Sequence, residues 1–199
     1  MAWLPMIVGF LAGALVLIAQ ITYIYHIFQK RLAPSVLSWL GWALLMGISA
    51  YSQIIDFGWN WSMLGLVLSV FGCIAISISG FIVGNYTLLK SDWYFLFAGM
   101  GCMILYVWFT DPWLTTWCAV IADLILGIPT LRNAIRNPHQ EKTSAWTFGL
   151  LSWTLTLGLC VGESLLMWLF PVYLFLFNVL MAYYTRQSRI NKKMLIPIK

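Results

Sequence analysis

The chain has 199 residues, of which 62% are hydrophobic and only 9% are charged, and its formal net charge is +5. Soluble domains carry about 25% charged residues because their surfaces face water, so this composition excludes an ordinary soluble protein. Apolar runs long enough to cross a bilayer fill most of the chain, which predicts an all-α polytopic membrane protein. The four cysteines lie inside these runs, and we interpret them as small buried residues.

Seven apolar runs follow one another along the chain, and each predicts a membrane-spanning helix. A span of about 20 residues crosses about 30 Å of hydrocarbon. The connections between the runs are short, so we expect no soluble domain between the helices. The runs lie at 4–28, 35–57, 61–84, 93–110, 112–132, 145–169 and 171–185.

The basic residues predict the orientation of these spans. With seven spans, all 11 lysines and arginines fall on one side, which the positive-inside rule makes cytoplasmic. The N-terminus is then outside and the C-terminus inside. A basic tail at 189–199 meets anionic lipid headgroups and accounts for the net charge without nucleic acid. Trp39 and Trp146 fall at predicted inner helix ends, where tryptophan rings favour the interface.

A weak internal repeat divides the chain. Aligning Trp39 with Trp146 also brings Trp61 onto Trp168 and Asp56 onto Glu163. Two three-helix units of the same orientation need one further crossing between them, which predicts a 3+1+3 plan of parallel repeats. The expected parts are a first triple-helix repeat at 1–88, a linker helix at 89–111, a second triple-helix repeat at 112–188 and the tail.

The segments IADLILGIPTLRNAIRNPHQEKTSAW and LAPSVLSWLGWALL resemble small bacterial seven-helix membrane proteins of the SWEET/PQ-loop superfamily. The proline–glutamine pair of that group is absent, since Pro129-Thr130 and Thr22 stand at the aligned positions. The resemblance implies a carrier in the bacterial inner membrane that binds its substrate between the two units and works by alternating access. It also implies a proline hinge in the first helix of each unit, of which only Pro129 is present. Vitamin transporters of the nicotinamide riboside type share this plan and stay an alternative.

Asp123 is the main candidate for chemistry. It lies eleven residues from Pro112, or about 16 Å along a helix, close to the bilayer midplane. A charged carboxylate at that depth costs a few kcal/mol, so the side chain is expected to face the bundle interior or to be protonated. We predict that Asp123 binds substrate or couples transport to protons. The alternative is a carboxyl group that hydrogen-bonds a neighbouring helix for packing alone.

Other polar and aromatic residues inside the runs extend this candidate site. Glu163 is predicted about 9 Å from the outer end of its run, where it lines an outer vestibule or simply meets solvent. Asn178 and Gln20 are candidate pocket residues, with interhelical hydrogen bonding as the alternative. Trp42 and Trp153 lie deeper than the interfacial rings and are candidates for stacking on a flat ligand, although core packing is the commoner role.

Two function classes remain. The first is a transporter of a small polar metabolite, a facilitator or a proton-coupled carrier. The second is a receptor or accessory membrane protein that binds a ligand on the same scaffold without moving it. We expect no enzyme, because the chain has no nucleophile–base–acid set, phosphate loop or metal cluster, and no second aspartate stands at the depth of Asp123. Neither a cofactor nor a metal is expected, and a homo-oligomer is left open.

Overall fold

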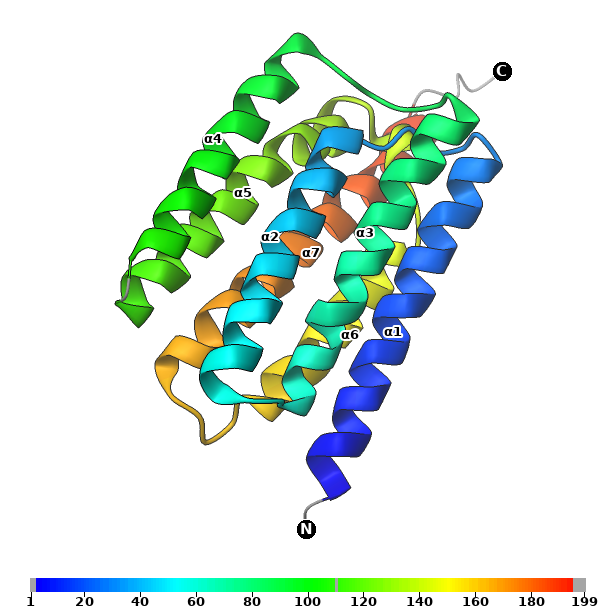
Figure 1. Cartoon of the computed structure of the whole chain (residues 1–199). Helices are drawn as coiled ribbons and strands as arrows, with labels where there is room; N and C mark the ends of the chain where they lie inside the picture. Colours follow the sequence, from blue (N-terminus) through cyan, green and yellow to red (C-terminus); the bar gives the residue numbers. More distant parts are fainter. Residues whose placement is uncertain (1–2, 110, 195–199) are drawn as a thin grey trace, which may run out of the picture.

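The computed structural model describes residues 3–109 and 111–194, and over these residues the chain forms seven α-helices and two short 3-10 turns. The helices run roughly side by side, with α1 beginning at one end of the bundle and α7 ending at the other (Figure 1). The α-helices are α1 (Trp3–Phe28), α2 (Val36–Phe57), α3 (Leu64–Val83), α4 (Lys90–Trp108), α5 (Pro112–Arg136), α6 (Ala145–Leu159) and α7 (Leu165–Met194), and the turns are η1 (Trp61–Met63) and η2 (Pro138–Gln140).

The helices of the bundle are long and apolar, and their outer faces carry exposed apolar side chains. Four segments in the described chain are long and apolar enough to cross a membrane, namely Trp3–Phe28, Trp61–Val83, Thr116–Arg136 and Leu165–Arg186, and Val36–Tyr51 and Ala145–Leu159 are shorter apolar helices. Large apolar side chains also cover the outer faces, such as Ile82 at 70% exposure and Phe71 at 67%. Because soluble monomers do not expose continuous apolar surfaces, the protein is membrane-embedded. By length and composition, four of the described segments can cross a membrane, and seven spans stay a prediction.

The boundary between the last two helices differs from the predicted one. We expected a run at 145–169 and a break before Pro171, but α6 ends at Leu159 and Pro171 lies inside α7. Gly162 adopts a φ of 90° in the turn between them, a conformation that glycine reaches at little cost. Pro171 has no N–H for the carbonyl of Met167, and the thiol of Cys160 lies 3.6 Å from that oxygen. A proline inside a helix was therefore misread as a helix boundary.

The two halves of the bundle pack in the same way. Helices α1, α2 and α3 form the first set, and α5, α6 and α7 form the second. Helix α3 contacts both α1 and α2, and α7 contacts both α5 and α6. Across the two sets, α1 packs on α6, and α5 packs on α2. Helix α4 packs mainly on α5 and less on α2. The third helix of each set therefore lies between the other two, and the first helix of each set meets the second helix of the other.

One hydrogen bond joins each of these two contacts between the sets. Ser152 on α6 donates to the main-chain carbonyl of Ala12 on α1, at 2.8 Å. Trp42 on α2 donates through Nε1 to the main-chain carbonyl of Asp123 on α5, at 3.1 Å. In both cases the second helix of one set donates to the first helix of the other. Because all four residues are buried, these bonds hold the facing helices at a fixed register.

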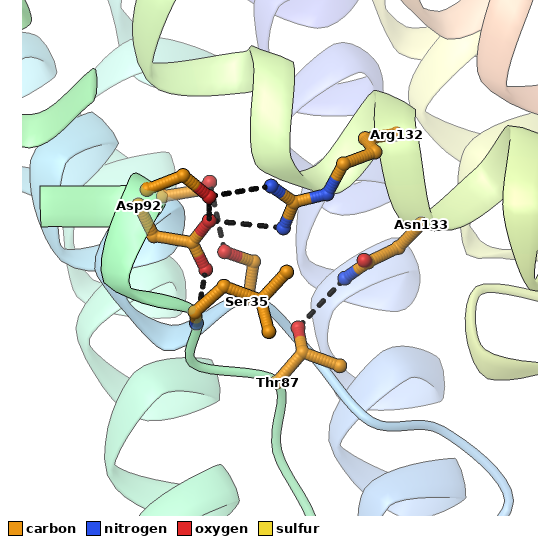
Figure 2. A network of polar contacts seen from close by, with 8 residues as sticks. Ser35, Thr87, Asp92, Arg132 and Asn133 are labelled. Carbon is orange, nitrogen blue, oxygen red and sulfur yellow. Dashed lines mark hydrogen bonds and ion pairs between the residues drawn. The ribbon is translucent and has the colours of Figure 1, made fainter. Parts of the chain in front are cut away.

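A buried ion pair connects α4 to α5, close to Thr87 in the connection between α3 and α4 (Figure 2). Arg132 donates through Nη2 to Asp92 Oδ1 at 2.9 Å, and the Asp92 side chain is 0% exposed. The other oxygen of Asp92 accepts the main-chain N–H of Leu89 at 2.9 Å. Asn133 donates to the hydroxyl of Thr87 at 2.7 Å. Arg132, expected to mark only the cytoplasmic side, therefore also has a structural partner.

Two tryptophans lie elsewhere than expected. Trp39 and Trp146 were predicted at the lipid interface, but they are 7% and 6% exposed and belong to the core. Their ring centroids are 6.0 Å apart. The residues aligned by the internal repeat thus meet each other between the two sets of helices, a contact that hydropathy alone does not reveal.

Candidate functional site

A cavity of about 90 Å³ lies between the two sets of helices, and side chains of α1, α2, α3, α5, α6 and α7 line it. Five of the six residues proposed as binding or proton-coupling residues from the sequence meet there. These are Gln20, Trp42, Asp123, Trp153 and Asn178. Residues from five helices that are far apart in the chain therefore form one site.

Asp123 is the only carboxylate among the described residues that line the cavity. It is 1% exposed, and Tyr173 on α7 donates to its Oδ2 at 2.7 Å. Its Oδ1 is buried and has no hydrogen-bond partner. Leaving a buried acceptor unpaired costs free energy, and such a group in a native structure calls for a ligand, water or proton.

The two amide side chains of the site each pack against a glycine. Gln20 on α1 lies against Gly72 on α3, and Asn178 on α7 lies against Gly149 on α6. Their amide nitrogens bond main-chain carbonyls, Gln20 to Ser69 at 3.4 Å and Asn178 to Leu174 at 2.9 Å. Both glycines are needed for space, because a Cβ at either position would overlap the amide.

Gly149→Ala is accordingly expected to lower the thermal unfolding midpoint of the purified protein. Its methyl group would force Asn178 out of place, and such overpacking typically costs about 1–3 kcal/mol. Gly158→Ala is the matched control on the same helix, where no heavy atom lies within 4 Å of an added Cβ. Alanine is the better helix former, so this control should keep or raise the midpoint. Equal midpoints for the two variants would contradict the close contact at Gly149.

Aromatic rings form much of the cavity wall. Trp42 packs edge-on against Trp39 and Phe177, with ring centroids 5.1 Å and 5.6 Å apart. Tyr23 lies 4.9 Å from Trp39 and 5.9 Å from Trp146 by ring centroids. All five rings line the cavity, together with Trp153. Such aromatic pairs stabilise the fold by about 0.5–1.5 kcal/mol beyond their buried area.

Glu141, which the sequence analysis did not single out, is buried beside this wall. It lies in the connection between α5 and α6 and is 0% exposed. Tyr23 donates to its Oε2 at 2.5 Å, and Trp146 donates to its main-chain carbonyl at 3.1 Å. Its Oε1 has no partner. Burial raises the pKa of the Glu141 carboxyl from 4.5 to about 8, against the smaller lowering by the Tyr23 hydroxyl.

This pKa predicts how stability depends on pH. Folded Glu141 keeps its proton up to about pH 8, whereas the unfolded chain releases it above 4.5. The contribution of Glu141 to the free energy of unfolding is therefore complete below pH 4.5 and is lost as the pH rises to about 8. Glu141→Gln, which stays neutral, should lessen the fall of the unfolding midpoint over this range. Glu163→Gln, at an exposed carboxylate, should leave the fall unchanged, and an equal slope for all three proteins would contradict a protonated Glu141.

Comparison with protein-family models, curated proteins and solved structures finds no match to this chain. The resemblance to the SWEET/PQ-loop superfamily stays a prediction.

Glu163 does not belong to this site. It lies exposed in the turn between α6 and α7, because α6 ends earlier than expected, and it does not line the cavity. Its repeat partner Asp56 has a side chain outside the described residues. For Glu163 the prediction of a position about 9 Å deep in a helix was wrong, since it assumed a helix through residue 169.

Pro129 lies in the body of α5, six residues beyond Asp123, and is buried. The helix continues past it to Arg136. The proline leaves the carbonyl of Ile125 without its helical donor. The hinge role of Pro129 stays a prediction, and Pro171 is a second proline inside a helix of the second set.

Besides Glu141, three further residues were missed because their role depends on partners distant in sequence. Tyr173 binds Asp123 from α7, Tyr23 binds Glu141 from α1, and Cys73 places a thiol on the cavity wall. A glutamate in a basic loop is expected to face solvent. Nothing in the neighbouring sequence therefore predicted that Glu141 is buried. Among the described residues, no group of three or more His, Cys, Asp or Glu could hold a metal ion.

Proposed function

We propose that this protein is a carrier that moves a small polar metabolite across a membrane through the cavity at Asp123. The observation that carries the proposal is a buried carboxylate with an unpaired oxygen in a cavity lined by both sets of helices. Ionisable side chains inside membrane helices are costly, and they commonly mark substrate or ion pathways. Sites between repeated helical units near the bilayer midplane are the usual arrangement in such carriers.

The proposed carrier has seven spans in a 3+1+3 plan, with α4 as the linker helix. Support comes from the equivalent packing within the two sets and from the matching contacts of α1 with α6 and of α5 with α2. The proposed orientation places the N-terminus outside and the C-terminus in the cytoplasm, as expected from the basic residues in a bacterial inner membrane. Helix α7 extends to Met194, so the tail predicted from residue 189 begins as part of that helix.

Alternating access then requires the aromatic wall to open. Tyr23, Trp39 and Trp146 cover the cavity on the side of Glu141, which is the proposed cytoplasmic side. Opening to the cytoplasm would separate α1 from the α5–α6 connection and break the bond between Tyr23 and Glu141. The rearrangement resembles the rocking of one repeat against the other, with the substrate site fixed between them.

The native thiol of Cys73 offers a direct test, because it lines the cavity. Cys102, Cys118 and Cys160 are replaced by alanine, and the protein is reconstituted in one orientation into liposomes. A small impermeant methanethiosulfonate reagent is then added to one side at a time, with a variant that also has Cys73→Ala as control. A carrier predicts that Cys73 reacts from both sides. Reaction from one side only, under every condition, would favour the alternative of a receptor or accessory protein that does not transport.

A further inference from the structure

The charges around the cavity are unbalanced. Asp123 contributes a carboxylate, while no Lys, Arg or His is found among the described residues that line the cavity. Arg132, the nearest basic residue along α5, is paired with Asp92. A negative ligand would meet the carboxylate without any compensating cation. The cavity therefore disfavours anions and would be neutralised by a positive ligand.

The hydrogen-bonding groups point to the same choice. Two buried acceptors at the cavity are unpaired, Asp123 Oδ1 and Gln20 Oε1. Several donors are already in use, since Trp42 Nε1, Gln20 Nε2 and Asn178 Nδ2 each bond a main-chain carbonyl. Trp39 Nε1 is a buried donor without a partner and offers a place for one acceptor atom. A ligand that satisfies this set must chiefly donate hydrogen bonds, as an ammonium group does.

The walls suit a cation with a carbon skeleton. Six aromatic residues line the cavity, four of them tryptophans, namely Tyr23, Trp39, Trp42, Trp146, Trp153 and Phe177. Aromatic faces attract ammonium groups, tryptophan most strongly, and several rings around one site recognise organic ammonium ions. A strongly hydrated metal ion gains less here, because aromatic walls cannot replace its water ligands.

The size of the cavity limits the ligand. Its volume is about 90 Å³, whereas an apolar cavity of about 150 Å³ accommodates benzene. In this conformation the cavity is therefore too small for a six-membered ring, which excludes sugars and nucleosides.

We propose that the cavity binds a small organic ammonium ion, with its charge on Asp123 and its carbon atoms against the tryptophan rings. This inference rests on the proposed function, because it names the substrate class of the same site. Binding itself does not require transport, so the two can fail separately.

The first experiment measures binding to the purified full-length protein in detergent. Methylammonium and ethylammonium chlorides are compared with methanol, ethanol, sodium acetate and matched NaCl or KCl. Tetramethylammonium chloride is a further control, because this cation has no N–H to donate to Asp123 Oδ1 and Gln20 Oε1. We expect only the methylammonium and ethylammonium salts to raise the unfolding midpoint and to change tryptophan fluorescence saturably. Asp123→Asn should weaken this binding by about 100-fold. Trp153→Leu should weaken it about fivefold, and Trp153→Phe less.

A second readout uses the wild-type thiol and does not depend on how the Asp123 variant folds. In the protein that retains Cys73 alone, ammonium ions should slow the reaction of Cys73 with a methanethiosulfonate reagent. The cationic aminoethyl reagent should react faster than the anionic sulfonatoethyl reagent. Protection by alcohols or acetate, equal protection by NaCl or KCl, or faster reaction of the anionic reagent would overturn the proposal.

The carrier function is tested separately in proteoliposomes with labelled methylammonium. Saturable binding in detergent without protein-dependent flux would leave the ammonium site in place and overturn the carrier. Protein-dependent flux of a neutral solute, without any ammonium binding, would support the carrier and overturn the ammonium site.

Discussion

Asp123→Asn is expected to reduce protein-dependent substrate uptake by about 100-fold, because truncating one partner of a buried charge contact costs roughly 2–5 kcal/mol. The substitution keeps the size of the side chain and its ability to accept the bond from Tyr173, which lies at 2.7 Å. It removes the charge and the proton that the carboxyl group can exchange. The fold should persist, since the packing of α5 is unchanged. Initial uptake rates in proteoliposomes across a pH series measure the effect.

Two further variants test whether the effect belongs to the carboxylate of Asp123 and its hydrogen bond from Tyr173 rather than to any acid on α5. Tyr173→Phe removes one hydrogen bond to a charged group, worth about 1.5–3 kcal/mol, so uptake should fall by roughly tenfold. Asp111→Asn is the matched control on the same helix, because Asp111 is exposed and accepts the N–H of Leu114 at 2.8 Å. Asparagine serves equally well at this helix start. Full uptake by Asp123→Asn at every pH would leave Asp123 with a packing role alone.

Arg132→Ala is expected to destabilise the protein by about 3–5 kcal/mol, because it leaves the charge of Asp92 buried without its partner. The Asp92 side chain is 0% exposed and the Arg132 side chain 16% exposed, so water compensates little. The loss should appear in unfolding by denaturant or heat in detergent. Arg136→Ala, one turn further along α5, is the control, since Arg136 is exposed. It should cost well under 1 kcal/mol.

The double variant Asp92→Asn/Arg132→Leu tests the reason for that loss. Asparagine retains an oxygen for the N–H of Leu89, and no unpaired charge stays behind. Replacing a buried ion pair by neutral groups is often close to neutral in stability. We therefore expect the double variant to recover most of the loss of Arg132→Ala. A double variant as unstable as the single one would show that the arginine acts through packing rather than charge.

Much of the site was predictable because polar groups are conspicuous in apolar runs. Gln20, Asp123 and Asn178 stand out in this way, and Trp42 and Trp153 stand out by their depth. The structure brings these five residues to one cavity. Glu163 was placed wrongly, because a proline inside α7 was taken for the end of a helix. Glu141 was missed, because its burial depends on Tyr23 and Trp146 rather than on its own loop.

The sequence by itself determined that the protein is helical and membrane-embedded, since the length and composition of apolar runs depend only on neighbouring residues. It also indicated which helix holds the buried acid. Only the tertiary structure decided which helices face one another, because side chains of α1, α5 and α7 meet through contacts that no local pattern records. The same holds for the pairing of Asp123 with Tyr173, of Glu141 with Tyr23 and of Arg132 with Asp92. Burial and charge compensation arise between segments, and the chemistry of this site follows from them.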